Sequence, residues 1–255
     1  MLIYPSSSGY TERFAGSGDS KLYCRYVRRG APGVVFIAGL GDSSDTWDVV
    51  QARISQKYSR FSYDRAGTGR SQADLGPRTC IEMVEELSEL LQLLEVEQPY
   101  ILVGHSFDGL IARLYTSMYP QLVSGMVLID AAAEYKELAY EEVLPDKLIS
   151  QNREYYSNPM LNSERINKPH SYKQVAERTR KSDLNISIII RGLPDEANDE
   201  WPHEEILRID QQMQRDFLRL STSSKCRMAT GSGHYIHHDE PEIVIEEIMA
   251  MIKGG

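Results

Sequence analysis

The sequence predicts an α/β fold with a mostly parallel central sheet and helices on both faces. Short apolar runs, typical of buried strands, alternate with longer stretches in which apolar residues recur every three or four positions, as in amphipathic helices. Such alternation along one chain builds a parallel sheet covered by helices. The 255 residues, 41% of them hydrophobic, are enough for one sizeable core.

The individual elements follow from these patterns. Residues 21–28 alternate in polarity and predict an early, half-exposed strand. Further strands are expected at 34–38, 59–63, 100–104, 125–130, 186–190 and 226–229. Helices are expected near 79–95, 204–220 and 241–252, and another after residue 109.

Ser106 lies at the junction between a predicted strand and the helix that follows it, and this junction is the most informative one in the sequence. The apolar run before it ends at Gly104, and helical spacing begins at Leu110, so the serine falls in a tight turn between a strand and a helix. Such a turn lifts the hydroxyl out of the sheet, where it faces the N–H groups of the following helix. The segment 104–109 therefore predicts a nucleophile elbow, the turn that exposes a catalytic serine.

Asp108 departs from the usual elbow pattern, Gly-x-Ser-x-Gly. A glycine normally stands two positions after the serine, and here it comes one position later, as Gly109. The Asp108 carboxylate is expected either to turn into solvent or to strain the elbow. A charge beside Ser106 would disfavour the oxyanion that forms during acyl transfer.

Four segments together resemble the α/β-hydrolase superfamily, in particular its serine esterases and lipases. Residues 34–41 look like the strand and oxyanion loop, and residues 63–71 like the Asp-x-x-Gly-x-Gly-x-Ser segment. The elbow follows, and residues 231–242 match the histidine loop and closing helix. The resemblance implies an α/β-hydrolase fold with a core formed by residues 1–133 and 185–255. Residues 134–184 would then form a helical cap over the active site.

The proposed cap has a distinctive composition. Three prolines are expected to break it into short helical pieces, and tyrosines recur along it. These are Pro145, Pro159 and Pro169, and Tyr135, Tyr140, Tyr155, Tyr156 and Tyr172. The tyrosines either pack against the body of the protein or line a substrate pocket.

The resemblance also assigns the catalytic roles. Ser106 would be the nucleophile and His234, five residues before Asp239, its base. His105 is expected to point into the packing, and His237 and His238 to lie in a solvated loop. The oxyanion hole would be formed by the backbone N–H groups of Leu40 and Phe107.

The acid of the triad has two candidates. Asp130 ends the strand before the cap, as in certain lipases, whereas Asp195 lies in a Gly-x-x-Asp turn after the strand that follows the cap. Either position can deliver a carboxylate to the histidine. We favour Asp130, because the segment Leu-Ile-Asp-Ala-Ala is closer to the lipase-like form and several acids compete near residue 195.

Composition limits the partners and the compartment. A net charge of -9 without a basic run gives no support for nucleic-acid binding. No apolar run approaches the length of a membrane span, and residues 1–18 do not have the pattern of a signal peptide. Cys24, Cys80 and Cys226 are widely spaced, which suits reduced thiols in the cytoplasm and gives no metal-ligand pattern.

These observations predict a cytoplasmic serine hydrolase that cleaves an ester, thioester or related acyl bond of a small, partly apolar molecule. No cofactor or metal is expected, and a monomer and a dimer are equally compatible. Epoxide hydrolases and dehalogenases of this fold would carry an aspartate in place of Ser106. A cofactor-free haloperoxidase or perhydrolase is one alternative, and a non-catalytic small-molecule receptor on the same scaffold is another.

Overall fold

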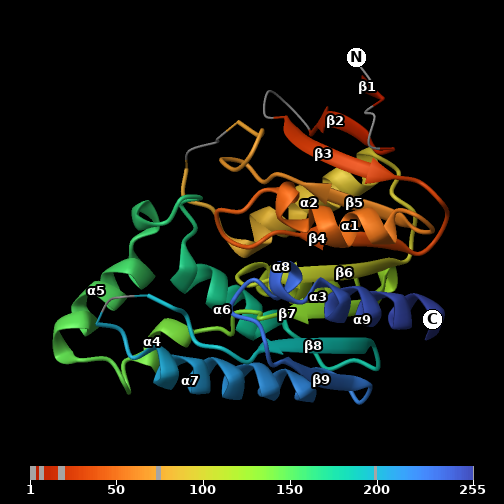
Figure 1. The fold of residues 1–255 in the computed structure, drawn as a ribbon. Helices are drawn as coiled ribbons and strands as arrows, with labels where there is room; N and C mark the ends of the chain where they lie inside the picture. The colour runs from red at the N-terminus through yellow and green to blue at the C-terminus, as the bar shows by residue number, and fades with distance from the viewer. Residues whose placement is uncertain (1–3, 6–8, 17–20, 73–75, 198–199, 255) are drawn as a thin grey trace.

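A computed structural model of the chain describes residues 4–5, 9–16, 21–72, 76–197 and 200–254. Within them, nine strands form one sheet in the order β1-β2-β3-β5-β4-β6-β7-β8-β9 (Figure 1). Pairing is antiparallel from β1 to β5 and parallel from β5 through β4 to β9. The predicted α/β fold with a mostly parallel sheet is therefore confirmed.

Strands β3 to β9 lie where the sequence pattern predicts them, to within two residues at each end. Their bounds are β1 Tyr4–Pro5, β2 Thr11–Ala15, β3 Leu22–Val27, β4 Gly33–Ile37, β5 Ser59–Tyr63, β6 Tyr100–His105, β7 Val123–Ile129, β8 Asn185–Arg191 and β9 Ser224–Ala229. The sequence did not predict β1 and β2, which are short strands at one edge of the sheet. β3 is more buried than expected, since Leu22 and Cys24 pack into the core and Arg25 bonds Asp48.

Helices cover both faces of the sheet (Figure 1). Their bounds are α1 Asp48–Ile54, α2 Cys80–Leu93, α3 Asp108–Met118, α4 Lys136–Tyr140, α5 Asp146–Ser157, α6 Lys168–Arg178, α7 His203–Arg215, α8 Ile236–Asp239 and α9 Pro241–Gly254. Short 3₁₀ turns are η1 Ser44–Trp47, η2 Pro120–Leu122, η3 Pro159–Leu161 and η4 Asp216–Leu220. Side chains of α2, α3 and α6 build one core, and those of α1 and α9 build the core on the opposite face.

The segment between β7 and β8 contains α4, α5, η3 and α6, so it is helical, as expected. Its prolines divide it into short helical pieces, as expected, and each stands at the start of a piece: Pro145 precedes α5, Pro159 opens η3 and Pro169 is the second residue of α6. Proline suits these positions because the first N–H groups of a helix have no partner within it. α6 also packs into the main core through Tyr172 and Val175. The division of the chain into core and cap stays a prediction.

Candidate active site

Ser106 occupies a strained turn between β6 and α3. Its φ is +53°, in the left-handed region that side chains rarely adopt. Two glycines leave room for this turn. A Cβ added at Gly104 would lie 2.7 Å from the Asp108 carbonyl oxygen, and one at Gly109 would collide with Ala131. The glycine needed for close packing is therefore Gly109, which explains why position 108 tolerates a larger residue.

His234 lies between Ser106 and Asp130. Its Nε2 is 3.0 Å from Ser106 Oγ, and its Nδ1 is 2.5 Å from Asp130 Oδ2. The serine follows β6, the aspartate follows β7 and the histidine follows β9, so the carboxyl ends of three strands bring the groups together. Asp130 also has a positive φ, +38°, at the turn where its strand ends. The three side chains form one hydrogen-bonded chain from hydroxyl to carboxylate.

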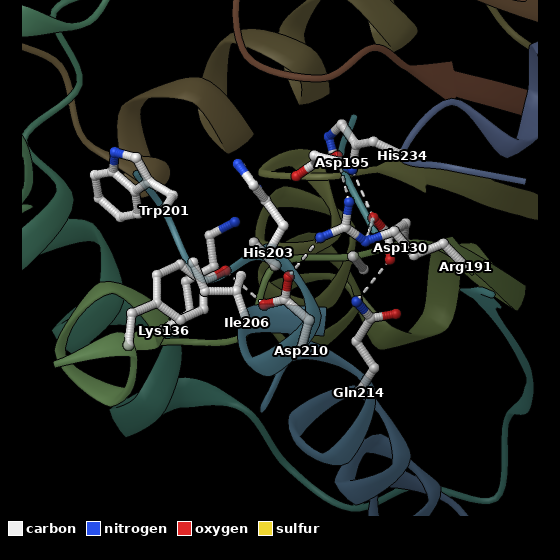
Figure 2. A pocket seen from close by; sticks show the side chains of 13 residues that line it. Asp130, Lys136, Arg191, Asp195, Trp201, His203, Ile206, Asp210, Gln214 and His234 are labelled. Carbon is white, nitrogen blue, oxygen red and sulfur yellow. Dashed lines mark hydrogen bonds and ion pairs between the residues drawn. The ribbon is translucent and has the colours of Figure 1, made fainter. Parts of the chain in front are cut away.

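Two further side chains fix the Asp130 carboxylate. Gln214 donates a hydrogen bond of 2.9 Å from Nε2 to Oδ1, and Arg191 Nε lies 3.4 Å from Oδ2 (Figure 2). Burial acts to raise the pKa of Asp130, but the hydrogen bond with His234 and the charge of Arg191 outweigh it and hold the pKa below its usual value. The carboxylate is therefore ionised and oriented toward the histidine.

Asp195, the other candidate acid, does not reach the histidine ring by a hydrogen bond. Its carboxylate forms an ion pair with Arg191, which also contacts Asp210 at 3.1 Å (Figure 2). Arg191 thus contacts both aspartates, but only Asp130 is bonded to His234. Of the two expected acids, the structure brings Asp130 to His234.

Leu40 and Phe107 are the residues whose backbone N–H groups are expected to form the oxyanion hole. Both line a cavity of about 300 Å³ that also contains Ser106. Within the described residues, neither backbone N–H donates a hydrogen bond to another backbone group. Two unused donors beside a nucleophile are what an oxyanion hole requires.

Arg65 orients the peptide that carries the Leu40 N–H. From a fully buried position, its guanidinium donates to the carbonyl oxygens of Ala38 at 2.6 Å and Gly39 at 2.8 Å. The Gly39 carbonyl and the Leu40 N–H belong to one peptide unit, and in a trans peptide they point in opposite directions. Holding the carbonyl on Arg65 therefore directs the N–H away from Arg65. A hydrogen bond at the carbonyl also polarises the peptide and strengthens the N–H as a donor.

Glu164, from the segment between η3 and α6, completes this arrangement. It accepts hydrogen bonds from Arg65 through both oxygens, at 2.6 and 2.7 Å, and from the Gly41 N–H at 2.7 Å. Burial acts to raise the pKa of Glu164, but the charge of Arg65 outweighs it and lowers the pKa. The sequence analysis did not identify Arg65 or Glu164 as site residues. Arg65 could have been noticed, because it lies inside the recognised motif at residues 63–71.

Of the two outcomes expected for Asp108, exposure to solvent is wrong, because its side chain is completely buried. Its Oδ1 lies 3.0 Å from Arg65 Nη1. The alignment is not that of a hydrogen bond, and neither carboxylate oxygen accepts one from the described residues. Burial consequently raises the pKa of Asp108 well above its usual value, although Arg65 opposes the shift.

The other histidines pack behind the site. His105 is buried, as expected, and its Nε2 lies 3.0 Å from the His234 carbonyl oxygen. The expectation of a solvated loop is wrong for His237, which is buried with its ring 4.3 Å from that of Trp47 and is bonded to Thr46. Its neighbour His238 is exposed. In the described part of the chain, no group of three or more histidine, cysteine, aspartate or glutamate side chains could hold a metal ion.

Two cavities open beside the serine–histidine–aspartate chain. The one at Ser106 is lined by five aromatic side chains, Phe107, Tyr140, Tyr155, Tyr172 and Trp201, together with polar and charged groups that include Lys136, Glu137 and Lys168. The other, of about 230 Å³, lies at His234 and is lined by Asp130, Arg191, Asp195, His203 and Asp210 (Figure 2). Three of the five tyrosines noted in the cap segment therefore face the Ser106 cavity.

Among the described residues, no helix has both the length and the apolar character that a membrane span requires.

Comparison with known proteins identifies the family. Residues 32–177 match the family model of the α/β-hydrolase fold, so the chain belongs to that family. It is 32% identical over 223 residues to the uncharacterized protein YqjL of Bacillus subtilis (strain 168), covering 85% of this chain and 83% of the relative.

Solved structures give the same fold. A thermophilic esterase from Thermogutta terrifontis superposes with a TM-score of 0.61 at 14% identity, covering 96% of this chain and 98% of the esterase. Epoxide hydrolase VrEH1 from Vigna radiata gives 0.71, also at 14% identity, covering 98% of this chain and 100% of the hydrolase. Proteins of two different activities are thus similar to this chain, and only its site residues can distinguish between activities.

Proposed function

We propose that this protein is a serine hydrolase that cleaves an ester, thioester or related acyl bond of a small, partly apolar molecule. The observation that carries the proposal is the hydrogen-bonded chain from Ser106 through His234 to Asp130. A serine hydroxyl is a weak nucleophile unless an adjacent base removes its proton, and an acid that fixes the histidine tautomer makes the ring an effective base. An epoxide hydrolase or dehalogenase of this fold would instead use a carboxylate at position 106.

The proposed reaction proceeds through an acyl-enzyme. Ser106 Oγ attacks the substrate carbonyl carbon while His234 Nε2 takes the hydroxyl proton, and the N–H groups of Leu40 and Phe107 stabilise the negative oxygen. His234 then gives the proton to the leaving alcohol or thiol as the bond to the carbonyl breaks. Water, deprotonated by the same histidine, attacks the acyl-enzyme and releases the acid and free Ser106. No cofactor takes part in these steps.

The cavity at Ser106 supports a small substrate. Its volume, about 300 Å³, lies at the lower end of the range for ligand sites, and its aromatic walls favour an apolar segment. A non-catalytic receptor was suggested only by Asp108. The side chain of Asp108 contacts Arg65, so no observation favours that alternative over a hydrolase.

Labelling with a fluorophosphonate tests the proposal, because this reagent phosphonylates only an activated serine. We expect one adduct per wild-type chain by intact mass, located on Ser106 by peptide mapping. The S106A variant should lose the adduct, and the S150A control, at an exposed position on α5, should keep it. Absence of labelling on folded wild-type protein, or labelling of S106A at another serine, would contradict the proposal.

A further inference from the structure

Lys136 is the residue at which the two cavities meet. It is the first residue of α4, and it lines the cavity that contains His234 (Figure 2) as well as the cavity that contains Ser106. Any molecule that bonds to Ser106 and fills either cavity therefore lies beside this side chain. The reaction proposed above makes no use of Lys136.

Among the described residues, no hydrogen bond or ion pair joins the Lys136 ammonium to another side chain, and its one ring contact is with Tyr140, whose centre lies 5.9 Å away. The acids around it are already bonded to other groups. Asp210 accepts from Tyr140 at 2.5 Å and pairs with Arg191 at 3.1 Å. Asp130 is bonded to His234 and Gln214, as described above.

Lys168, which lines the same cavity, shows the contrasting arrangement. Its ammonium is 2.9 Å from Glu137 Oε1 and 3.5 Å from the centre of the Tyr155 ring. Tyr172 donates to the same Glu137 carboxylate at 2.8 Å. Lys168 and Glu137 therefore form an ion pair with each other in the lining of the cavity. Among the described residues of this cavity, Lys136 is the cation that has no ion pair.

The charge on Lys136 is retained in spite of its position. Burial acts to lower the pKa of this lysine, but the electrostatic effect of Tyr140 and of the Asp210 and Glu137 carboxylates outweighs it and raises the pKa. The neighbouring carboxylates are bonded to other groups, so none of them is hydrogen-bonded to the Lys136 ammonium. A ligand carboxylate could form that charge-assisted hydrogen bond.

We propose that Lys136 binds a carboxylate of the substrate, so that the enzyme prefers acyl compounds carrying one negative charge. This inference rests on the proposed function. A single ammonium matches a monoanion, whereas a dianion such as a phosphate monoester would also face the nearby Asp210 and Glu137 carboxylates. The aromatic walls of Tyr155, Tyr172 and Trp201 suit an apolar or aromatic segment between the carboxylate and the reacting carbonyl.

Two matched substrate pairs test the proposal, one for each side of the scissile bond. Mono-p-nitrophenyl adipate against p-nitrophenyl hexanoate places the carboxylate on the acyl side. 4-Acetoxybenzoate against its methyl ester places it on the leaving group. In at least one pair we expect wild-type kcat/KM to favour the acid by roughly tenfold to a hundredfold, the range of one charge-assisted hydrogen bond.

The variant K136M should abolish that preference, and K136R, which keeps the charge, should retain part of it. K147M is the control, because Lys147 is exposed and paired with Glu200 on the surface. A wild-type enzyme that prefers the neutral ester in both pairs would overturn the inference, as would a K136M variant that lowers kcat/KM for acid and neutral esters in equal proportion. Fluorophosphonate labelling of Ser106 separates the two failures: labelling without an acid preference refutes only the role of Lys136, whereas absent labelling refutes the proposed function itself.

Discussion

At Asp130, one carboxylate is contacted by three side chains with different effects. His234 bonds one oxygen, Gln214 the other, and the Arg191 charge lies nearby. The amide fixes the orientation of the carboxylate, and the hydrogen bond with His234, supported by the Arg191 charge, keeps it ionised. A histidine held in this way presents its free Nε2 to Ser106 in the tautomer that can accept a proton.

The two candidate acids can be distinguished by replacing each with its amide. We expect Asp130→Asn to lower kcat by roughly 10⁴-fold, because the amide would favour the wrong histidine tautomer. Asp195→Asn removes one of several contacts to Arg191 and should lose far less. Steady-state hydrolysis of a p-nitrophenyl ester measures both. A larger loss in Asp195→Asn than in Asp130→Asn would reverse our assignment.

Among the elements, the most informative contact is between the oxyanion loop and the segment before α6. Glu164 and Arg65 are 99 positions apart, yet their side chains are bonded to each other and to both sides of the loop at 38–41. Glu164 thereby links the segment before α6, the helix that carries Lys168 and Tyr172 of the Ser106 cavity, to the peptide proposed to stabilise the oxyanion. Displacement of this segment is expected to disturb the loop as well.

The Glu164→Gln variant tests this link. The amide still offers an oxygen to the Gly41 N–H but no longer carries the charge that holds Arg65. Since the Leu40 N–H acts mainly in the transition state, we expect kcat to fall roughly tenfold to a hundredfold with little change in KM. Glu154→Gln, at an exposed position on α5, is the matched control. A higher KM at unchanged kcat would instead indicate a role in substrate binding.

For the molecule as a whole, the buried His105 couples stability to pH. Burial, with a further contribution from the charge of His234, lowers the pKa of His105 to about 3, whereas an unfolded histidine titrates near 6.5. Between these pH values, His105 is protonated in the unfolded chain and neutral in the folded protein. The free energy of unfolding therefore decreases as pH falls through this window, by up to about 1.4 kcal/mol per pH unit from this group.

The variant His105→Gln removes this titration while leaving a side chain that can donate to the His234 carbonyl. We expect its stability relative to wild type to improve steadily as pH is lowered from 7 to 4, even if it is less stable at pH 7. Urea unfolding at each pH gives the comparison. Parallel curves for the two proteins would show that His105 does not contribute to the acid sensitivity.

Much of this molecule was predictable because its signals are local. Apolar runs and helical periodicity depend on residues a few positions apart, and they located β3 to β9 and the larger core helices. The turn around Ser106 and the loop before His234 were visible for the same reason. β1 and β2 were missed because a short edge strand shows little pattern.

The tertiary structure alone decided which distant residues meet. The sequence left both Asp130 and Asp195 open with a slight preference for Asp130, and only the arrangement of β7, β8 and α7 brings Asp130 to His234 and Asp195 to Arg191. The environment of Asp108 likewise depends on Arg65, which reaches it from another strand end. Local periodicity determines elements, but the partner of a buried charge depends on how strands order in the sheet, and no short stretch of sequence specifies that order.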